Sequence, residues 1–194
     1  DIILLEQQWE YTSGAQDYIP IEWWTDYAGS GQSYNAVYAA IVTAVANGIH
    51  VVQAGGNGNV NTGLLSWYGD SGSIIVGAGG ASGNNDRQRL SFSGYGPRFN
   101  LQGWGENIVT PGGGYNGPDL YSSEGPNYYY TNTFNGTSGA SPIVAGALAC
   151  TQAYYLANLS SVPATPSYMR SHLATYGTAQ AFGPSGNIGP RPDI

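Results

Sequence analysis

The chain has 194 residues, of which 41% are hydrophobic, and this size and composition indicate one globular domain, residues 1–194, with a sizeable core. Charged residues make up only 9% of the chain, and 12 acidic against 5 basic side chains give a net charge of −7. This balance argues against nucleic acid or an anionic membrane as a partner. No apolar run approaches the roughly 20 residues of a membrane span. The single cysteine, Cys150, excludes an internal disulfide.

The first part of the sequence predicts a strand, a helix and a second strand. Residues 2–5 are the apolar run Ile-Ile-Leu-Leu, which is typical of a strand buried on both faces of a parallel sheet. Residues 9–32, rich in Tyr, Trp, Pro and Gly, predict a long surface connection. Helical spacing predicts a helix over 33–47 that ends at Gly48, and 49–54 predict a second buried strand. This order predicts parallel pairing with a right-handed crossover.

The second part predicts more of the same architecture. In chain order the segments are a strand over 73–78, weaker strand candidates at 89–93 and 107–109, a Tyr- and Gly-rich loop over 116–132, helices over 138–156 and 167–176, and a Gly/Pro-rich tail over 183–194. Pro142 lies in the first turn of the longer helix, where its missing N–H costs nothing. Small residues between 145 and 149 would let that helix pass close to the sheet. The predicted fold class is α/β, with a mostly parallel sheet flanked by helices.

The segment with the clearest chemistry is Phe-Asn-Gly-Thr-Ser-Gly-Ala-Ser-Pro at 134–142. Ser138 could be only a helix N-cap, a position that Ser favours. As a nucleophile it would need a base and a group that orients the base, and the chain has two histidines. His50 begins the second strand, about 15 to 20 Å from Asn57 at the other end. His172 lies on the last helix, with no Asp between it and Ser138. Neither is predicted to be the base.

Four landmarks carry a resemblance to a known family. They are the helix and strand at 44–58, which end in Ala-Gly-Gly-Asn-Gly, the strand Ile-Val-Gly-Ala at 75–78, the turn Ser-Phe-Ser-Gly-Tyr-Gly-Pro at 91–97, and Gly-Thr-Ser-Gly-Ala-Ser-Pro at 136–142. In this order they resemble the subtilisin-like serine peptidases, the subtilases, whose nucleophile segment reads Gly-Thr-Ser-x-Ala-Ser-Pro. The resemblance spans most of the chain, so it implies the subtilisin-like fold.

The resemblance also implies roles for individual residues. Ser138 would be the acyl-transfer nucleophile, and Asn57 would donate to the oxyanion beside the Ser138 N–H. Gly136 would let the backbone approach the substrate closely. Two strand edges would bind an extended peptide by β-augmentation, formed by Leu5, Glu6 and Gln7 on one side and by Gln53, Ala54 and Gly55 on the other. The structural alternatives are a turn residue at Asn57 and a plain turn glycine at Gly136.

One stretch departs from the family pattern. Subtilases usually carry Ser-Leu-Gly-Gly after the first strand, where this chain has Leu5-Glu6-Gln7-Gln8. The change bears on the side chain accepted at P1, the residue before the scissile bond. Glu6 favours a basic or small P1 residue, or is simply a solvated charge at the end of a strand.

A further expectation concerns a partner. In this family the triad order is Asp, His, Ser, and the first two lie upstream of the strand that residues 2–5 resemble. The prediction is therefore the carboxyl-terminal part of a secreted, processed endopeptidase acting on peptides or proteins, completed by a separate amino-terminal chain. That chain would supply Asp and His and pair with the exposed sheet edge.

Other interpretations stay open at this point. The scaffold could be an inactive carbohydrate- or peptide-binding protein that uses surface aromatics, or the chain could be a proteolytic remnant. The aromatics concerned are Trp23, Trp24, Trp67, Tyr68, Trp104 and Tyr128 to Tyr130. No cofactor is predicted. Asp86 is either a turn carboxylate or a contributor to a Ca²⁺ site.

Overall fold

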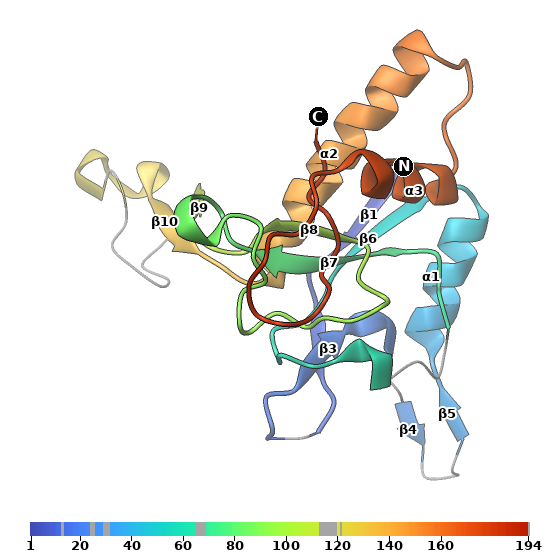
Figure 1. Ribbon diagram of the computed structural model, residues 1–194, viewed down its shortest axis with the longest axis horizontal. Helices are drawn as coiled ribbons and strands as arrows, with labels where there is room; N and C mark the ends of the chain where they lie inside the picture. Colours follow the sequence, from blue (N-terminus) through green and yellow to red (C-terminus); the bar gives the residue numbers. More distant parts are fainter. Residues whose placement is uncertain are drawn as a thin grey trace.

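The computed structural model describes residues 1–12, 14–23, 26–28, 32–64, 69–112, 120 and 122–193. At its centre is a four-stranded sheet in the order β1-β6-β7-β8, in which every neighbouring pair is parallel (Figure 1). The strands are β1 (Ile2–Leu5), β6 (His50–Ala54), β7 (Ile74–Gly79) and β8 (Leu101–Trp104). The predicted α/β fold with a mostly parallel sheet is confirmed.

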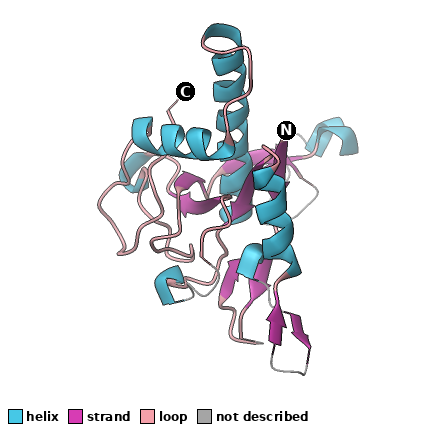
Figure 2. Ribbon diagram, turned by 90° about the vertical axis from the view of Figure 1, so that its right-hand side faces the viewer, coloured by secondary structure: helices cyan, strands magenta, loops and turns pink. Residues whose placement is uncertain are grey.

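Three α-helices flank the sheet, namely α1 (Ala36–Ala46), α2 (Thr137–Asn158) and α3 (Pro166–Tyr176). Helix α2 contacts all four strands of the sheet. Figure 2 shows its carboxyl-terminal turns extending beyond the sheet. All three helices were predicted from the sequence to within a few residues at each end.

The two faces of the sheet are separated by the alternation of side chains along each strand. In β1, Ile2 and Leu4 pack with α2 and α3, whereas Ile3 and Leu5 lie on the α1 side. The core under α2 and α3 contains Val52, Ile74, Val76, Leu101, Ala140, Val144, Leu148, Ala164, Met169 and Leu173. A second cluster contains Ile19, Trp23, Ile75, Phe99 and Ile188. The sheet is therefore covered by apolar side chains on both faces, as expected for parallel strands.

Short antiparallel hairpins surround the sheet. They are β2 (Gln8–Glu10) with β3 (Tyr18–Pro20), β4 (Asp26–Ala28) with β5 (Gln32–Tyr34), and β9 (Ile108–Pro111) with β10 (Tyr130–Phe134). Five 3₁₀ turns complete the described structure, η1 (Ile21–Trp23), η2 (Thr62–Leu64), η3 (Gly83–Asn85), η4 (Ser122–Glu124) and η5 (Pro126–Tyr128). The β9–β10 hairpin extends away from the main sheet, at the left of Figure 1.

Several sequence predictions of local structure were wrong. Residues 9–32 are not a surface connection, because their described part contains β2, β3, η1 and β4 and buries Ile19 and Trp23. Residues 89–93 form only an isolated bridge with β7. The fourth sheet strand is instead β8, whose sequence Leu-Gln-Gly-Trp has no apolar run. The candidate at 107–109 became β9, outside the main sheet.

The close contact between α2 and the sheet also differs from the prediction. Gly146 is exposed, and a side chain there would meet nothing within 4 Å. The tight approach lies one turn into the helix, where a Cβ on Gly103 would come within 2.3 Å of the Ala140 carbonyl oxygen. Pro142 is the sixth residue of α2, so it lies beyond the first turn in which it was predicted.

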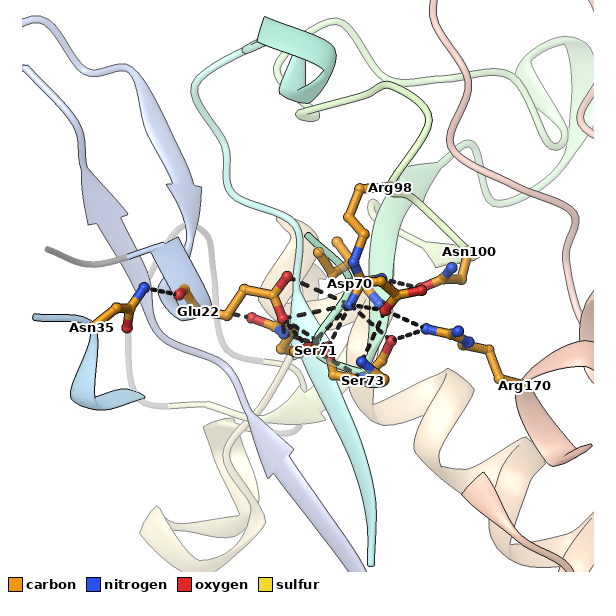
Figure 3. A network of polar contacts seen from close by, with 11 residues as sticks. Glu22, Asn35, Asp70, Ser71, Ser73, Arg98, Asn100 and Arg170 are labelled. Carbon is orange, nitrogen blue, oxygen red and sulfur yellow. Dashed lines mark hydrogen bonds and ion pairs between the residues drawn. The ribbon is translucent and has the colours of Figure 1, made fainter. Parts of the chain in front are cut away.

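A buried polar network fixes η1 against the sheet (Figure 3). The Glu22 side chain is fully buried, and its Oε2 accepts hydrogen bonds from Gln53 Nε2 at 2.6 Å, from Ser73 Oγ at 2.9 Å and from Ser71 Oγ. Arg98 Nη2 lies 3.4 Å from Glu22 Oε1. Burial lowers the pKa of Arg98, and the neighbouring carboxylates raise it in part. The network joins four segments that are distant in sequence, around Glu22, Gln53, Ser71 to Ser73, and Arg98.

An outer carboxylate extends this network to α3. Asp70 Oδ1 lies 3.1 Å from Arg98 Nη2 and 2.7 Å from Arg170 Nη1. Arg170 also donates to the Ser73 carbonyl oxygen at 3.1 Å. Helix α3 is therefore tied to the start of β7 by charge as well as by apolar packing.

We expect Glu22→Ala to lower the free energy of unfolding by about 3 kcal/mol, because it leaves buried donors and the Arg98 charge without their central acceptor. Urea unfolding followed by fluorescence measures the change. Glu124→Ala, which removes an exposed carboxylate, is the control and should stay within about 0.5 kcal/mol of the parent. Equal stability of all three proteins would contradict the assigned role of the network.

Candidate active site

Ser138 lies in the first turn of α2, immediately after the N-cap residue Gly136 and Thr137. Its side chain is partly exposed, and its Oγ donates to the Glu6 carbonyl oxygen at 3.2 Å. Glu6 directly follows β1. The structure therefore brings Ser138 into contact with the residue that follows the first strand.

Asn57 follows the carboxyl end of β6, and its side chain is held in one orientation. Its Oδ1 accepts hydrogen bonds from Thr137 N at 2.9 Å and from Thr137 Oγ1 at 2.9 Å. Both donors require an oxygen at that position, so Nδ2 must be the side-chain atom that points away. Thr137 Oγ1 in turn accepts from Gly56 N at 3.1 Å. The loop after β6 and the start of α2 are thus joined by three hydrogen bonds.

Gly136 opens a space between two donors. Its φ is +104°, and a Cβ built on it would lie 3.2 Å from Asn57 Nδ2 and 3.7 Å from Ser138 N. Neither Asn57 Nδ2 nor Ser138 N donates to any other residue that the structure describes. Two donors without partners beside a serine hydroxyl are the arrangement that stabilises a tetrahedral oxyanion. The role of Gly136 in substrate binding remains a prediction.

The predicted substrate-binding residues divide into two groups. Leu5 is partly exposed, and Glu6 and Gln7 are exposed at the carboxyl end of β1. Within the described residues β1 pairs only with β6, so its outer edge is open. Peptide binding along residues 5–7 remains a prediction.

The prediction for Gln53, Ala54 and Gly55 is wrong, because these residues are buried. Strand β6 lies between β1 and β7: Gln53 is paired on both sides, Ala54 pairs with Val76, and Gly55 N donates to the Val76 carbonyl at 2.9 Å. The Gln53 amide belongs to the Glu22 network. The loop beyond is covered by the β2–β3 hairpin, where Gly58 N donates to the Tyr18 carbonyl at 3.2 Å.

A pocket of about 430 Å³ lies beside Ser138. Its walls come from the end of β1, the β9–β10 hairpin and the first turns of α2. The lining residues are Glu6, Ile108, Val109, Thr110, Phe134, Gly139, Pro142 and Ile143. The hairpin residues were not predicted as part of a site, and the one signal for them was that Phe134 is the first residue of the nucleophile segment at 134–142.

Neither histidine can act on Ser138. His50 is buried at the amino end of β6, at the opposite end of the strand from Asn57, and burial lowers its pKa. His172 lies on α3, with its ring 5.6 Å from that of Tyr168 and 4.7 Å from that of Tyr176. Among the described residues, the one hydrogen-bond partner of Ser138 Oγ is the Glu6 carbonyl.

Other predicted features can be placed as well. Asp86 forms ion pairs with Arg87 and with Arg191, and the Arg191 guanidinium holds the pKa of Asp86 below its usual value. Two cations at this carboxylate argue against a Ca²⁺ site there. The described residues contain no cluster of three or more His, Cys, Asp or Glu arranged to hold a metal. No helix in this part of the chain combines the length and apolarity of a membrane span.

The predicted aromatic platform is only partly present. Trp23 is 4% exposed, so it cannot belong to a surface platform. Trp104 is 41% exposed and Tyr128 is 57% exposed. Trp24, Trp67 and Tyr68 lie outside the described residues.

The fold and the site define an α/β protein in which a serine at a helix start faces an amide donor at the carboxyl end of a parallel strand. The chain belongs to the subtilase family, because the Subtilase family model matches residues 14–187. The resemblance on which the sequence interpretation rested is thereby confirmed.

Individual relatives agree with this assignment. The chain is 32% identical over 162 residues to an extracellular serine proteinase of Thermus sp. (strain Rt41A), a match that covers 84% of this chain and 34% of that protein. The patellamide maturation protease PatA superimposes with a TM-score of 0.56 at 20% identity, over 82% of this chain and 51% of that one. A cold-adapted subtilisin-like serine proteinase gives a TM-score of 0.56 at 22% identity, over 83% and 50%. The chain thus spans about a third of the first relative and half of these structures.

We expect Thr137→Val to destabilise the protein by about 1 to 3 kcal/mol, because it removes the acceptor of the buried Gly56 N–H and one donor to Asn57. Thermal unfolding by calorimetry measures the loss. Thr151→Val on the same helix removes only a bond to the Ala147 carbonyl and is the matched control. Equal effects of the two substitutions would count against the Thr137 link as a special feature of the site.

Proposed function

We propose that this chain carries the nucleophile and the oxyanion hole of a secreted, subtilisin-like serine endopeptidase. The supporting observation is the convergence of two donors: Asn57 Nδ2 and Ser138 N lie 3.2 and 3.7 Å from the position that a Cβ on Gly136 would occupy. Ser138 Oγ attacks a peptide carbonyl carbon, and the developing oxyanion enters this space. The leaving amine departs with a proton, and water then hydrolyses the acyl-enzyme. Secretion is proposed by analogy with the extracellular Thermus proteinase.

The general base and its orienting carboxylate belong, in this proposal, to a separate amino-terminal chain. No described residue other than Glu6 contacts Ser138 Oγ by a hydrogen bond, and a carbonyl oxygen does not take a proton from a hydroxyl at neutral pH. An imidazole from the partner would replace the carbonyl as acceptor of this proton. Serine peptidase chemistry requires both added groups.

The open side of β1 supports this partner. No strand in the described part of the chain pairs with the outer edge of β1, and such an edge favours the addition of a further strand. Beside it, a groove of about 380 Å³ runs between β1 and α1. Its lining is entirely apolar: Ile3, Leu5, Ala36, Val37, Ala40, Ile41, Ala44 and Val51. A partner that adds a strand to the edge of β1 and places apolar side chains in the groove would cover both the edge and the groove.

We expect a fluorophosphonate or sulfonyl fluoride to label Ser138 in the protein purified from its source together with everything bound to it. Peptide mapping by mass spectrometry identifies the adduct. Ser138→Ala should abolish labelling and peptide hydrolysis, and Asn57→Ala should slow hydrolysis about 10²- to 10³-fold, as removal of the comparable donor does in a subtilisin. An unlabelled Ser138 in the purified protein would refute the peptidase proposal.

We expect amino-terminal sequencing and intact mass measurement of the active material to reveal a second polypeptide that contains the triad His and Asp. Ile3→Glu places a charge in the groove and should release this polypeptide during size-exclusion chromatography. Val162→Glu is the control, because Val162 is 65% exposed and lies outside the groove. A histidine segment continuous with this chain in one polypeptide would contradict the two-chain arrangement.

A further inference from the structure

The basic side chains of this protein are all engaged away from Ser138. There are five, all of them arginine, since the sequence contains no lysine. Arg87 and Arg191 pair with Asp86, Arg98 pairs with Glu22 and Asp70, Arg170 pairs with Asp70, and Arg89 donates to Asn59 and lies 4.4 Å from the centre of the Tyr95 ring. None of them forms an ion pair with Glu6.

Glu6 stands next to the reacting atom. Its own carbonyl oxygen is the acceptor 3.2 Å from Ser138 Oγ, so Glu6 is in direct contact with the nucleophile through its backbone. Glu6 is also one of the residues that line the pocket of about 430 Å³ beside Ser138. Glu6 is the one charged residue among the residues that line this pocket.

The rest of the lining is mainly apolar. Ile108 and Phe134 come from the β9–β10 hairpin, and Pro142 and Ile143 come from α2. A pocket with apolar walls and a single carboxylate matches a side chain with a long aliphatic stem and a cationic end, since such a side chain can bury its methylenes and keep its charge paired.

We propose that this pocket binds a lysine or arginine side chain of the peptide substrate and that the Glu6 carboxylate selects for its charge. The proposal rests on the proposed function in taking the ligand to be a peptide. The net charge of −7 acts in the same direction, because an acidic protein attracts basic segments over longer distances.

The test is a binding measurement that does not require turnover. Ser138→Ala is prepared in the intact purified protein, and calorimetry compares peptides that carry lysine with peptides that carry norleucine at the same position. Norleucine keeps the aliphatic stem and removes the charge. Because Glu6 is exposed, lysine peptides should bind only about two- to fivefold more tightly at low salt, and the difference should shrink in 0.5 M salt as screening increases.

Two further substitutions make the test specific. Glu6→Gln in the Ser138→Ala background should bind both peptides equally, and Glu10→Gln, which removes a carboxylate of β2 that does not line the pocket, should keep the preference. Equal binding of lysine and norleucine by the parent, or a preference that survives Glu6→Gln, would overturn the inference. In that case the pocket would be occupied by the added amino-terminal chain and not by a substrate side chain.

The same experiment separates this inference from the proposed function. The protein with Ser138 intact is assayed for hydrolysis of the same peptides. Glu6-dependent binding without any hydrolysis would support the basic-side-chain pocket and refute the peptidase. Hydrolysis without a preference for lysine would support the peptidase and refute the role of Glu6.

Discussion

The site depends on one link, the pair of hydrogen bonds from Thr137 to Asn57 Oδ1. This link joins the carboxyl end of a sheet strand to the amino end of the longest helix, two segments separated by 80 residues in the chain. It also decides which end of the Asn57 amide faces outward, since an oxygen that accepts two bonds leaves the nitrogen as the free donor. The tight packing of Gly103 against Ala140 holds the same helix end close to the sheet. Chemistry and core packing therefore depend on the same few contacts.

A second constraint is the position of β1. Among the described strands it lies at an edge of the sheet, and Glu6, which directly follows it, supplies the carbonyl that accepts the hydrogen bond from Ser138. Its partner β6 is secured from the other side by the buried Glu22 network, which joins η1, β6 and the start of β7. The sheet is thus tied to η1 through β6 and the start of β7, and within the described residues the outer side of β1, next to the nucleophile, has no paired strand. Such an edge usually needs a cover in a stable protein.

The sequence predicted well those parts of the fold that are encoded locally. The apolar runs at 2–5, 49–54 and 73–78 became sheet strands, and the family motifs located Ser138 and Asn57 in one site. It failed where long-range contacts decide the outcome. Strand β8 has no apolar run, because Gly103 leaves room for α2 and the buried Gln102 side chain donates to the Gly189 carbonyl. Gln53 was predicted to bind substrate, because the residues next to it in the sequence give no sign of its buried hydrogen bond to Glu22, 31 positions earlier.

The hydrogen bond from Ser138 to Glu6 has a consequence for control. A backbone carbonyl accepts a hydrogen bond but does not remove the proton, so the serine is held as a neutral alcohol of ordinary reactivity. Under the proposed two-chain arrangement, the isolated chain is latent without any inhibitory propeptide blocking its site. Its latency would end only on encounter with the second chain, so the onset of proteolysis would follow the concentrations of two polypeptides and behave as a second-order process.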